Sequence, residues 1–384
     1  MIKENALSTI ALSIPEITGN EWKYVKDCLD TGWVSSAGSY VTKFENMVAQ
    51  YAGAKYGIAC VNGTSGLHLS MHIHDVKLGD HLIVPNITFI ASANAASYTY
   101  AKPIFIDVDP ETWQMDLDLL DRFLSTKTEM RQNVCYLKST NKPIKAIMPV
   151  HVLGNMCDMP RLVNICSRFN ITVIEDASES LGSYYDGRHS GSFGKMSVFS
   201  FNGNKIITTG GGGVIVTDDE DLAKRTKHLT TQAKADPETY YHDEIGFNYR
   251  LVNVLAAIGV AQMEQLPNFI TKKKKIDAYY RQRLNNVGDL QFQKIESMVD
   301  PNCWLFTFSS TKQNEILKAL KSNKIIARPF WVPMNQLPMF QENHYVTEND
   351  YSRSVHQNSL SIPSSVSLKE EDMERVVKII KSIF

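Results

Sequence analysis

The sequence predicts an α/β protein in which helices flank a mostly parallel sheet and a smaller α+β domain follows. Short, continuously apolar segments alternate with amphipathic segments between residues 56 and 177, as in parallel sheets that are buried on both faces. Residues 286–384 instead mix short strands with amphipathic helices, and 384 residues are enough for two domains. We therefore expect a large domain over 1–255 and a small C-terminal domain over 256–384.

The alternation begins with five segments between residues 56 and 109. Three of them are apolar and bounded by turn residues, as strands are: YGIACVN, HLIVPN and KPIFIDVD. The two between them have the length and pattern of helices: GTSGLHLSMHIH and TFIASANAASYTY. This order indicates a doubly wound sheet, in which ligands bind where the strands end and the loops begin.

Residues 145–177 contain the clearest strand–helix–strand unit. The strands are KAIMPVHV and ITVIEDA, and the helix MPRLVNICSRFN lies between them. Asp158 and Pro160 fit the start of that helix, as a capping carboxylate and a first-turn proline. A helix between two apolar strands predicts that these strands run parallel in one sheet.

The second half of the chain carries longer helices. Residues 219–244 are polar and are predicted to be helical and exposed. The next two segments predict a buried helix start and a long helix that leaves the first domain: GFNYRLVNVLAAIGVAQME and LPNFITKKKKIDAYYRQRL. We expect its Lys272–Lys275 run to be a solvated face. Further on, WLFTFSS is a predicted strand, and QNEILKALKSN and KEEDMERVVKIIKSIF are predicted helices.

Composition limits the classes of protein. Forty basic and 41 acidic side chains nearly cancel, which argues against a nucleic-acid or membrane-surface protein, since both usually carry a basic excess. No apolar stretch approaches the roughly 20 residues that span a bilayer, and the first residues lack the pattern of a secretory signal. The six cysteines are scattered without a CxxC pair. We therefore expect reduced, mostly buried thiols and a cytoplasmic protein.

Asp176 and Lys205 are the candidate catalytic residues. Asp176 ends the strand ITVIED, and Lys205 follows the strand SVFSF at a turn. Each residue also has a common structural role as an alternative to catalysis: the aspartate could cap a helix, and the lysine could be an exposed turn residue. Together they suit pyridoxal 5′-phosphate, which needs a lysine to form a Schiff base and a carboxylate against its pyridine nitrogen.

The phosphate of such a cofactor needs further polar residues. Gly63, Thr64 and Ser65 follow a strand and begin an apolar helix, where backbone N–H groups and the helix dipole favour an anion. Ser200, five residues before the lysine, could donate another hydrogen bond. Phe89 could cover one face of the cofactor ring, although a lone aromatic residue more often belongs to the core.

Two other patterns do not predict a ligand. His68 and His72 have the spacing of a zinc pair, but the segment HLSMH lacks the glutamate of HExxH and lies in a predicted core helix. We therefore predict no metal site. The run Gly210–Gly213 has neither the GxGxxG nor the GxxxxGKS spacing, which argues against a dinucleotide or P-loop protein. We expect these glycines to let backbone pack closely behind the lysine turn.

Taken together, the motifs resemble the DegT/DnrJ/EryC1/StrS sugar aminotransferases, which belong to the aspartate aminotransferase-like, fold-type I superfamily. The resemblance covers nearly the whole chain. It rests on these segments: ITGNEWKYVKDCLDTGWVSS, NGTSGLHL, VPNITFIASANA, FIDVDPETWQMD, MPVHVLGN, IEDASESLGSYYDG, SFNGNKIITTGGGG, GFNYRLVNVLAA and RPFWVPMNQLPMF.

The resemblance implies a role for each matching residue. Lys205 matches the lysine that binds the cofactor, and Asp176 matches the partner of its pyridine nitrogen. Glu179 stands where many members have glutamine near the phenolic oxygen of the cofactor, and Gly211 stands where glutamate is common. Asn248 matches a residue that reaches the phosphate of the neighbouring subunit, which implies a homodimer with shared active sites. The other matching contacts are Thr64, Ser65, Phe89 and Ser200.

The resemblance also implies a reaction and a substrate. An amino group would pass from glutamate through the cofactor to the ketone of a nucleotide-linked sugar. The chain looks closest to the LegC-like enzymes of bacillosamine and legionaminic acid pathways, which aminate C4 of a 4-keto-6-deoxy-2-acetamido sugar. An arginine fork suits the diphosphate of such a substrate. The candidate substrate contacts are Trp33, Ser35, Ser36, Arg328 and Trp331.

Several alternatives to this function are compatible with the sequence. A perosamine synthase-like aminotransferase would act on a sugar without the 2-acetamido group, and a non-catalytic regulatory protein could keep the same fold. Sugar 3-dehydration in this fold uses a histidine at the position of Lys205, so the lysine speaks against it. Hydride transfer with a nicotinamide cofactor is disfavoured because the glycine fingerprint is missing.

Overall fold

The structure, a computed structural model, describes residues 8–236 and 238–384. Its centre is a large sheet in which most neighbouring strands are parallel. The exception in the strand order given below is β11, which runs antiparallel to both of its neighbours, β1 and β10. In spatial order the strands are β1 (Tyr56–Cys60), β11 (Gly213–Thr217), β10 (Met196–Ser200), β7 (Thr172–Asp176), β6 (Lys142–Ile147), β2 (His81–Pro85), β3 (Lys102–Ile106) and β18 (His344–Val346). The predicted mostly parallel sheet is therefore confirmed.

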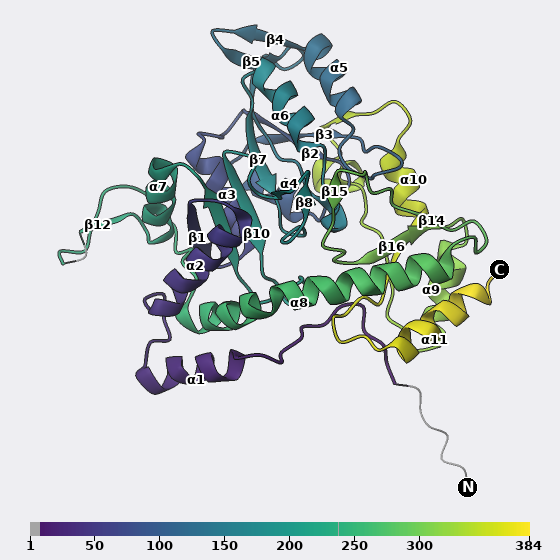
Figure 1. Cartoon of the computed structure of the whole chain (residues 1–384). Helices are drawn as coiled ribbons and strands as arrows, with labels where there is room; N and C mark the ends of the chain where they lie inside the picture. Colours follow the sequence, from purple (N-terminus) through teal and green to yellow (C-terminus); the bar gives the residue numbers. More distant parts are fainter. Residues whose placement is uncertain (1–7, 237) are drawn as a thin grey trace.

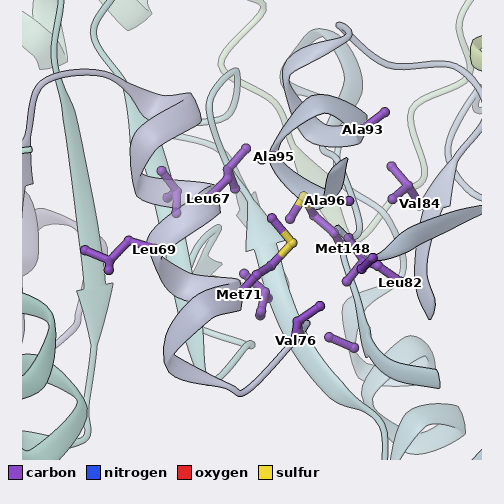
Figure 2. Packing of buried hydrophobic residues seen from close by; sticks show 14 of the residues in the cluster. Leu67, Leu69, Met71, Val76, Leu82, Val84, Ala93, Ala95, Ala96 and Met148 are labelled. Atoms are coloured by element: carbon purple, nitrogen blue, oxygen red, sulfur yellow. The ribbon is translucent and has the colours of Figure 1, made fainter. Parts of the chain in front are cut away.

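Helices cover both faces of this sheet, as the alternation of segments predicts (Figure 1). Leu82 and Val84 of β2 pack in one hydrophobic cluster, while Ile83 between them packs in another, because successive side chains of a strand point to opposite faces. The first face carries α3 (Gly63–Ile73) and α4 (Ala91–Tyr98), whose leucines, methionine and alanines interlock in Figure 2. The other face carries α2 (Ser39–Ala52), α5 (Leu117–Lys127) and α6 (Met159–Arg168), and the first half of α8 (Asn253–Leu284) packs there as well.

The local signals for α6 are confirmed in detail. The side chain of Asp158 accepts a hydrogen bond from the Arg161 N–H, and Pro160 stands in the first turn. Leu162 and Ile165 are buried against the sheet. The helix thus begins at its capping carboxylate and buries the apolar stripe that the sequence shows.

The helical prediction for residues 219–244 is correct only in its first half. Helix α7 (Glu220–Thr230) is followed by a two-stranded hairpin, β12 (Lys234–Asp236) and β13 (Tyr241–His242), which projects from the body as an arm (Figure 1). The carboxylate of Asp236 accepts from the Glu238 N–H and the Thr239 hydroxyl. This local side-chain turn competes with helix at that point.

The two helical segments predicted after residue 246 form one 32-residue helix, α8 (Asn253–Leu284). In Figure 1 this helix runs the length of the molecule, from the large sheet to the C-terminal elements. The prediction that Lys272–Lys275 is a solvated face is wrong for Lys273, which is buried. The helix passes between two packed parts of the protein, so the side of α8 that carries Lys273 faces other residues instead of water.

The C-terminal residues build a second, smaller sheet with its own hydrophobic cluster, and the predicted strand and helices there are confirmed. Its strands are β14 (Gln291–Phe292), β16 (Phe306–Ser309), β19 (Ser359–Ile362) and β17 (Arg328–Pro329), and its helices are α9 (Gln313–Ser322) and α11 (Glu370–Lys381). The boundary after residue 255 falls in the first turn of α8 and stays a prediction.

Strands β4 (Thr128–Arg131) and β5 (Val134–Leu137) extend the large sheet from β6. Strands β15 (Val299–Asp300), β8 (Tyr184–Tyr185) and β9 (Arg188–His189) form a separate three-stranded sheet, and the helices α1 (Glu21–Thr31) and α10 (Tyr351–Asn358) lie outside the sheets. All six cysteines are unpaired, and all but the half-buried Cys303 are buried, as predicted. Among the helices of the described residues, none has the length and apolar character needed to cross a membrane.

Candidate active site

A cavity of about 610 Å³ lies where β1, β2, β7 and β10 end. Residues from the C-terminal part of the chain close its other side, among them Trp304 and Phe330. The predicted site residues that line it are Gly63, Thr64, Phe89, Asp176, Glu179, Ser200, Lys205, Arg328 and Trp331. The doubly wound sheet therefore gathers at one edge residues that are spread over most of the sequence.

Asp176 is the last residue of β7 and is 4% exposed. The Ser92 hydroxyl donates to its Oδ2 at 2.7 Å, and the Ser178 N–H donates to its Oδ1 at 3.1 Å. The Ser92 hydroxyl also lies 3.0 Å from that of Thr88. These contacts fix the direction of the carboxylate at the cavity wall, with α4 supplying the main donor.

Lys205 lies in the turn after β10, where its N–H donates to the Asn202 carbonyl at 3.0 Å. Its side chain is only 11% exposed, and Nζ lies 3.6 Å from Oε1 of Glu179. The same nitrogen lies 4.1 Å from the centre of the Trp304 ring. An exposed turn lysine, the ordinary alternative in the sequence, is therefore excluded.

Glu179 is a buried carboxyl group beside this amine. Burial raises its pKa to about 7, an effect that Lys205 and the Leu153 N–H partly offset. The Leu153 N–H donates to Oε2 at 2.8 Å, and Leu153 itself has a left-handed backbone with φ of 63°. The Glu179 carboxyl group lines the cavity and can thus gain or lose a proton there near neutral pH.

The start of α3 forms a cradle with two serines. A Cβ atom added to Gly63 would lie 2.9 Å from Ser200 Cβ and 3.3 Å from Ser178 Oγ, so only glycine leaves this space open. The Ser65 N–H is already used by the capping side chain of Asn62, at 2.8 Å, and Ser65 does not line the cavity. Free N–H groups at a helix start and serine hydroxyls suit a phosphate group.

The glycine run behind the lysine turn packs closely at one position. A Cβ atom at Gly213 would lie 2.8 Å from the backbone carbon and oxygen of Asn62, which confirms the expected backbone contact there. Gly210 has a left-handed backbone with φ of 81°. Gly211 differs, because a Cβ atom there would meet only the Val61 oxygen, at 4.0 Å, and the residue lines the cavity.

Some predicted residues do not line this cavity. Trp33 lies in an exposed loop whose carbonyl accepts from Nδ2 of Asn253 at 2.7 Å, and the Ser35 carbonyl of that loop accepts from the Asn253 N–H at 2.6 Å. Ser36 is exposed in the same loop, and Asn248 is exposed near the projecting arm. Their predicted contacts are not made within one chain.

Sequence reasoning missed several residues of the site: Ser92, Ser178, Trp304 and Lys273. Ser92 and Ser178 carry no motif of their own, although each directly follows or lies near a motif residue. Lys273 on α8 reaches the site indirectly, since its Nζ donates to the Trp304 carbonyl at 2.9 Å and to the Ser364 carbonyl. No pattern in the sequence links residues that are so far apart.

The fold and the cavity together define a class of protein. A buried lysine amine, a strand-end carboxylate with a fixed direction and a phosphate cradle open into one cavity of the size of a small cofactor with its substrate. This set fits pyridoxal 5′-phosphate, which needs a lysine, an acidic partner and an anion site. The class is that of enzymes dependent on this cofactor.

The comparison with known proteins gives the family. Residues 15–381 match the DegT/DnrJ/EryC1/StrS aminotransferase family, and the chain belongs to it. The GDP-perosamine synthase of Caulobacter vibrioides is 36% identical over 98% of this chain and 99% of its own length. That of Escherichia coli O157:H7 is 38% identical over 96% of each.

Solved structures show the same fold. A DegT DnrJ EryC1 StrS aminotransferase from Brucella abortus superposes with a TM-score of 0.88 at 24% identity, over 95% of each chain. The predicted fold-type I architecture is therefore confirmed. The chain is a sugar aminotransferase of this family, and pyridoxal 5′-phosphate is its cofactor.

Substitution of Gly213 by alanine tests the backbone contact behind the cradle. The added Cβ atom would overlap the Asn62 backbone, so we expect Gly213→Ala to lower the free energy of unfolding by about 2 kcal/mol. Gly211→Ala is the matched control in the same run, because its Cβ atom meets only the Val61 oxygen at 4.0 Å. Denaturant unfolding followed by circular dichroism measures both, and equal stabilities of the two variants would contradict the close packing.

Proposed function

We propose that the chain transfers an amino group from glutamate to C4 of a nucleotide-linked 4-keto-6-deoxy sugar, for a bacterial surface glycan or a nonulosonic acid. One observation carries this proposal: the Lys205 amine and the Asp176 carboxylate line the same cavity as the cradle at Gly63. The relatives named above for perosamine support a sugar substrate of this kind.

Each residue of the site would have a separate role in such a reaction. The cofactor, when bound, supplies an electron sink and carries the amino group. Asp176, fixed by Ser92, would hold a proton against the pyridine nitrogen. Lys205 would bind the cofactor covalently and, when free, would hold and move a proton at Nζ. The Gly63 cradle would hold the phosphate.

Two further residues suit the cofactor ring and the substrate. Phe89 is 56% exposed but lines the cavity, so its ring is available to cover a flat ligand. Arg328 and Trp331 also line the cavity, from the C-terminal side. A guanidinium fork there suits a diphosphate, and an indole ring suits a sugar or a base.

The 2-acetamido group separates two candidate sugars. The sequence segments favour a LegC-like substrate with this group, whereas two relatives at 36% and 38% identity are named for GDP-perosamine. We give precedence to the perosamine-like sugar without the acetamido group, because these relatives are similar over almost the whole chain. The LegC-like sugar is the second candidate.

Reduction with borohydride tests the role of Lys205. We expect the purified protein to be yellow with cofactor and the reduced cofactor to be fixed on Lys205, as mass spectrometry of peptides would show. Lys205→Ala should lose the label and at least about 100-fold in transamination rate, because the proton carrier is gone. Lys273, whose pKa burial lowers to about 7, is the rival amine, and a label on Lys273 would overturn the assignment.

A panel of nucleotide-linked keto-sugars tests the substrate. The purified protein is incubated with glutamate and with UDP-, GDP- or dTDP-linked 4-keto-6-deoxy sugars, with and without the 2-acetamido group, and amino-sugar formation is measured by mass spectrometry. We expect the best rate with the GDP-linked sugar that lacks the acetamido group. Product only from acetamido sugars would instead support the LegC-like candidate, and no product from any 4-keto sugar would refute the proposal.

We also propose that the enzyme is a homodimer in which Asn248 completes the cavity of the partner. Asn248 is exposed and does not line the cavity of its own chain. The neighbouring arm presents Tyr240 and Tyr241, which are 73% and 62% exposed, and Ile245, shortly after the arm, is 86% exposed. Exposed large apolar side chains of this kind suit a contact with another protein surface.

Substitution of Asn248 tests the shared site. Loss of a hydrogen bond to a phosphate group should weaken cofactor binding by roughly 10- to 100-fold in Asn248→Ala. The control Asn349→Ala, at an exposed asparagine just before α10, should leave cofactor binding unchanged. Cofactor affinity is measured by absorbance titration and the assembly by sedimentation. An active monomer with unchanged affinity in Asn248→Ala would rule the shared site out.

A further inference from the structure

Trp304 makes the closest aromatic contact of the Lys205 amine. It is 3% exposed and lines the cavity, and its ring centre lies 4.1 Å from Lys205 Nζ. Glu179 Oε1 lies 3.6 Å from the same nitrogen. The amine therefore contacts both an indole face and a carboxyl group, two groups that attract a positive charge.

Trp304 also holds the backbone that carries the lysine. Its indole N–H donates to the carbonyl of Asn204, the residue directly before Lys205, at 2.7 Å. The Ser13 hydroxyl donates to this same carbonyl at 3.2 Å. One side chain therefore contacts both the peptide and the amine of the lysine.

The position of the Trp304 ring is itself fixed from behind. The backbone carbonyl of Trp304 accepts a hydrogen bond from the buried amine of Lys273 at 2.9 Å, and the backbone N–H of Trp304 donates to Asn302 Oδ1 at 3.0 Å. Lys273 also donates to Ser364, so α8 and the C-terminal sheet hold the segment that carries Trp304. These bonds fix the backbone of Trp304, and the indole N–H bond to the Asn204 carbonyl then fixes its side chain.

We propose that Trp304 is a positioning residue for Lys205, whose indole face forms, together with Glu179, the resting place of the Lys205 ammonium whenever the amine is not bound to the cofactor. The inference rests on the proposed function, since the lysine must leave the cofactor and return to it in each turnover. A charge-compensated resting place keeps the freed amine inside the cavity and close to its next proton transfer.

Glu179 can balance the lysine charge when its own carboxyl group is ionised. Burial raises its pKa to about 7, so the carboxylate beside the lysine forms above neutral pH. At lower pH the carboxyl group is neutral and the ring face of Trp304 carries more of the stabilisation. The two groups therefore act together on one ammonium.

The protonation of Lys205 tests this resting place without an activity assay. The full-length protein is saturated with pyridoxamine 5′-phosphate, which leaves the lysine free, and is pulsed with acetic anhydride between about pH 6 and 11. Mass spectrometry gives the fraction of Lys205 acetylated relative to exposed Lys127, and the pH midpoint follows from the series. Trp304→Phe keeps a ring face but lacks the N–H, and Trp304→Leu lacks both.

We expect the midpoint of Lys205 to fall by about one pH unit in Trp304→Leu and by less in Trp304→Phe, because the ring stabilises the ammonium. Glu179→Gln should lower it as well, while Lys127 stays unchanged in every variant. Equal midpoints in wild type, Trp304→Phe and Glu179→Gln would overturn the inference, and these two conservative variants decide it if Trp304→Leu does not fold. The borohydride experiment reports on the proposed function separately, so failure of one does not imply failure of the other.

Discussion

A buried carboxylate next to the site, that of Glu175, holds together the elements on which the cavity depends. It accepts hydrogen bonds from His151 Nε2 at 3.0 Å, from the Ser197 hydroxyl at 3.0 Å and from three backbone N–H groups within residues 191–194. Burial alone would raise the pKa of Glu175, but these donors outweigh it and hold the pKa below its usual value. Because β6, β7 and β10 are joined at this point, the position of Asp176, the next residue, is fixed relative to both neighbouring strands.

The second constraint comes from the C-terminal part of the chain. A lysine amine on α8 is buried completely, which costs free energy unless it finds acceptors, and Lys273 finds the carbonyls of Trp304 and Ser364. The helix therefore sets where Trp304 lies, and Trp304 closes the cavity over Lys205. Strand ends of the large sheet supply the groups that suit a cofactor, while the later residues determine the environment of the lysine.

Glu179 shows how a departure from the family pattern is accommodated. At the position that the resemblance places near the phenolic oxygen of the cofactor, a carboxylate would repel that oxygen if both were charged. The structure buries Glu179 and raises its pKa to about 7, so the neutral form is accessible near physiological pH. Gly211, the other departure, leaves open space at the cavity wall instead of a side chain. Both positions alter the charge and the shape of the cavity without disturbing the strands that carry it.

The sequence by itself determined the alternating strands and helices, and it predicted that Asp176 and Lys205 lie at one site, since both follow directly after strands; the two residues do line the same cavity. It also located Gly63 and Ser200 at the cradle, as the close contact of these residues shows. Only the tertiary structure decided that residues 234–242 form a hairpin, that Lys273 is buried and that Trp304 covers the lysine. The physical reason is that burial, pKa and ion pairing arise from contacts between segments that lie far apart in the chain, and no local pattern records them.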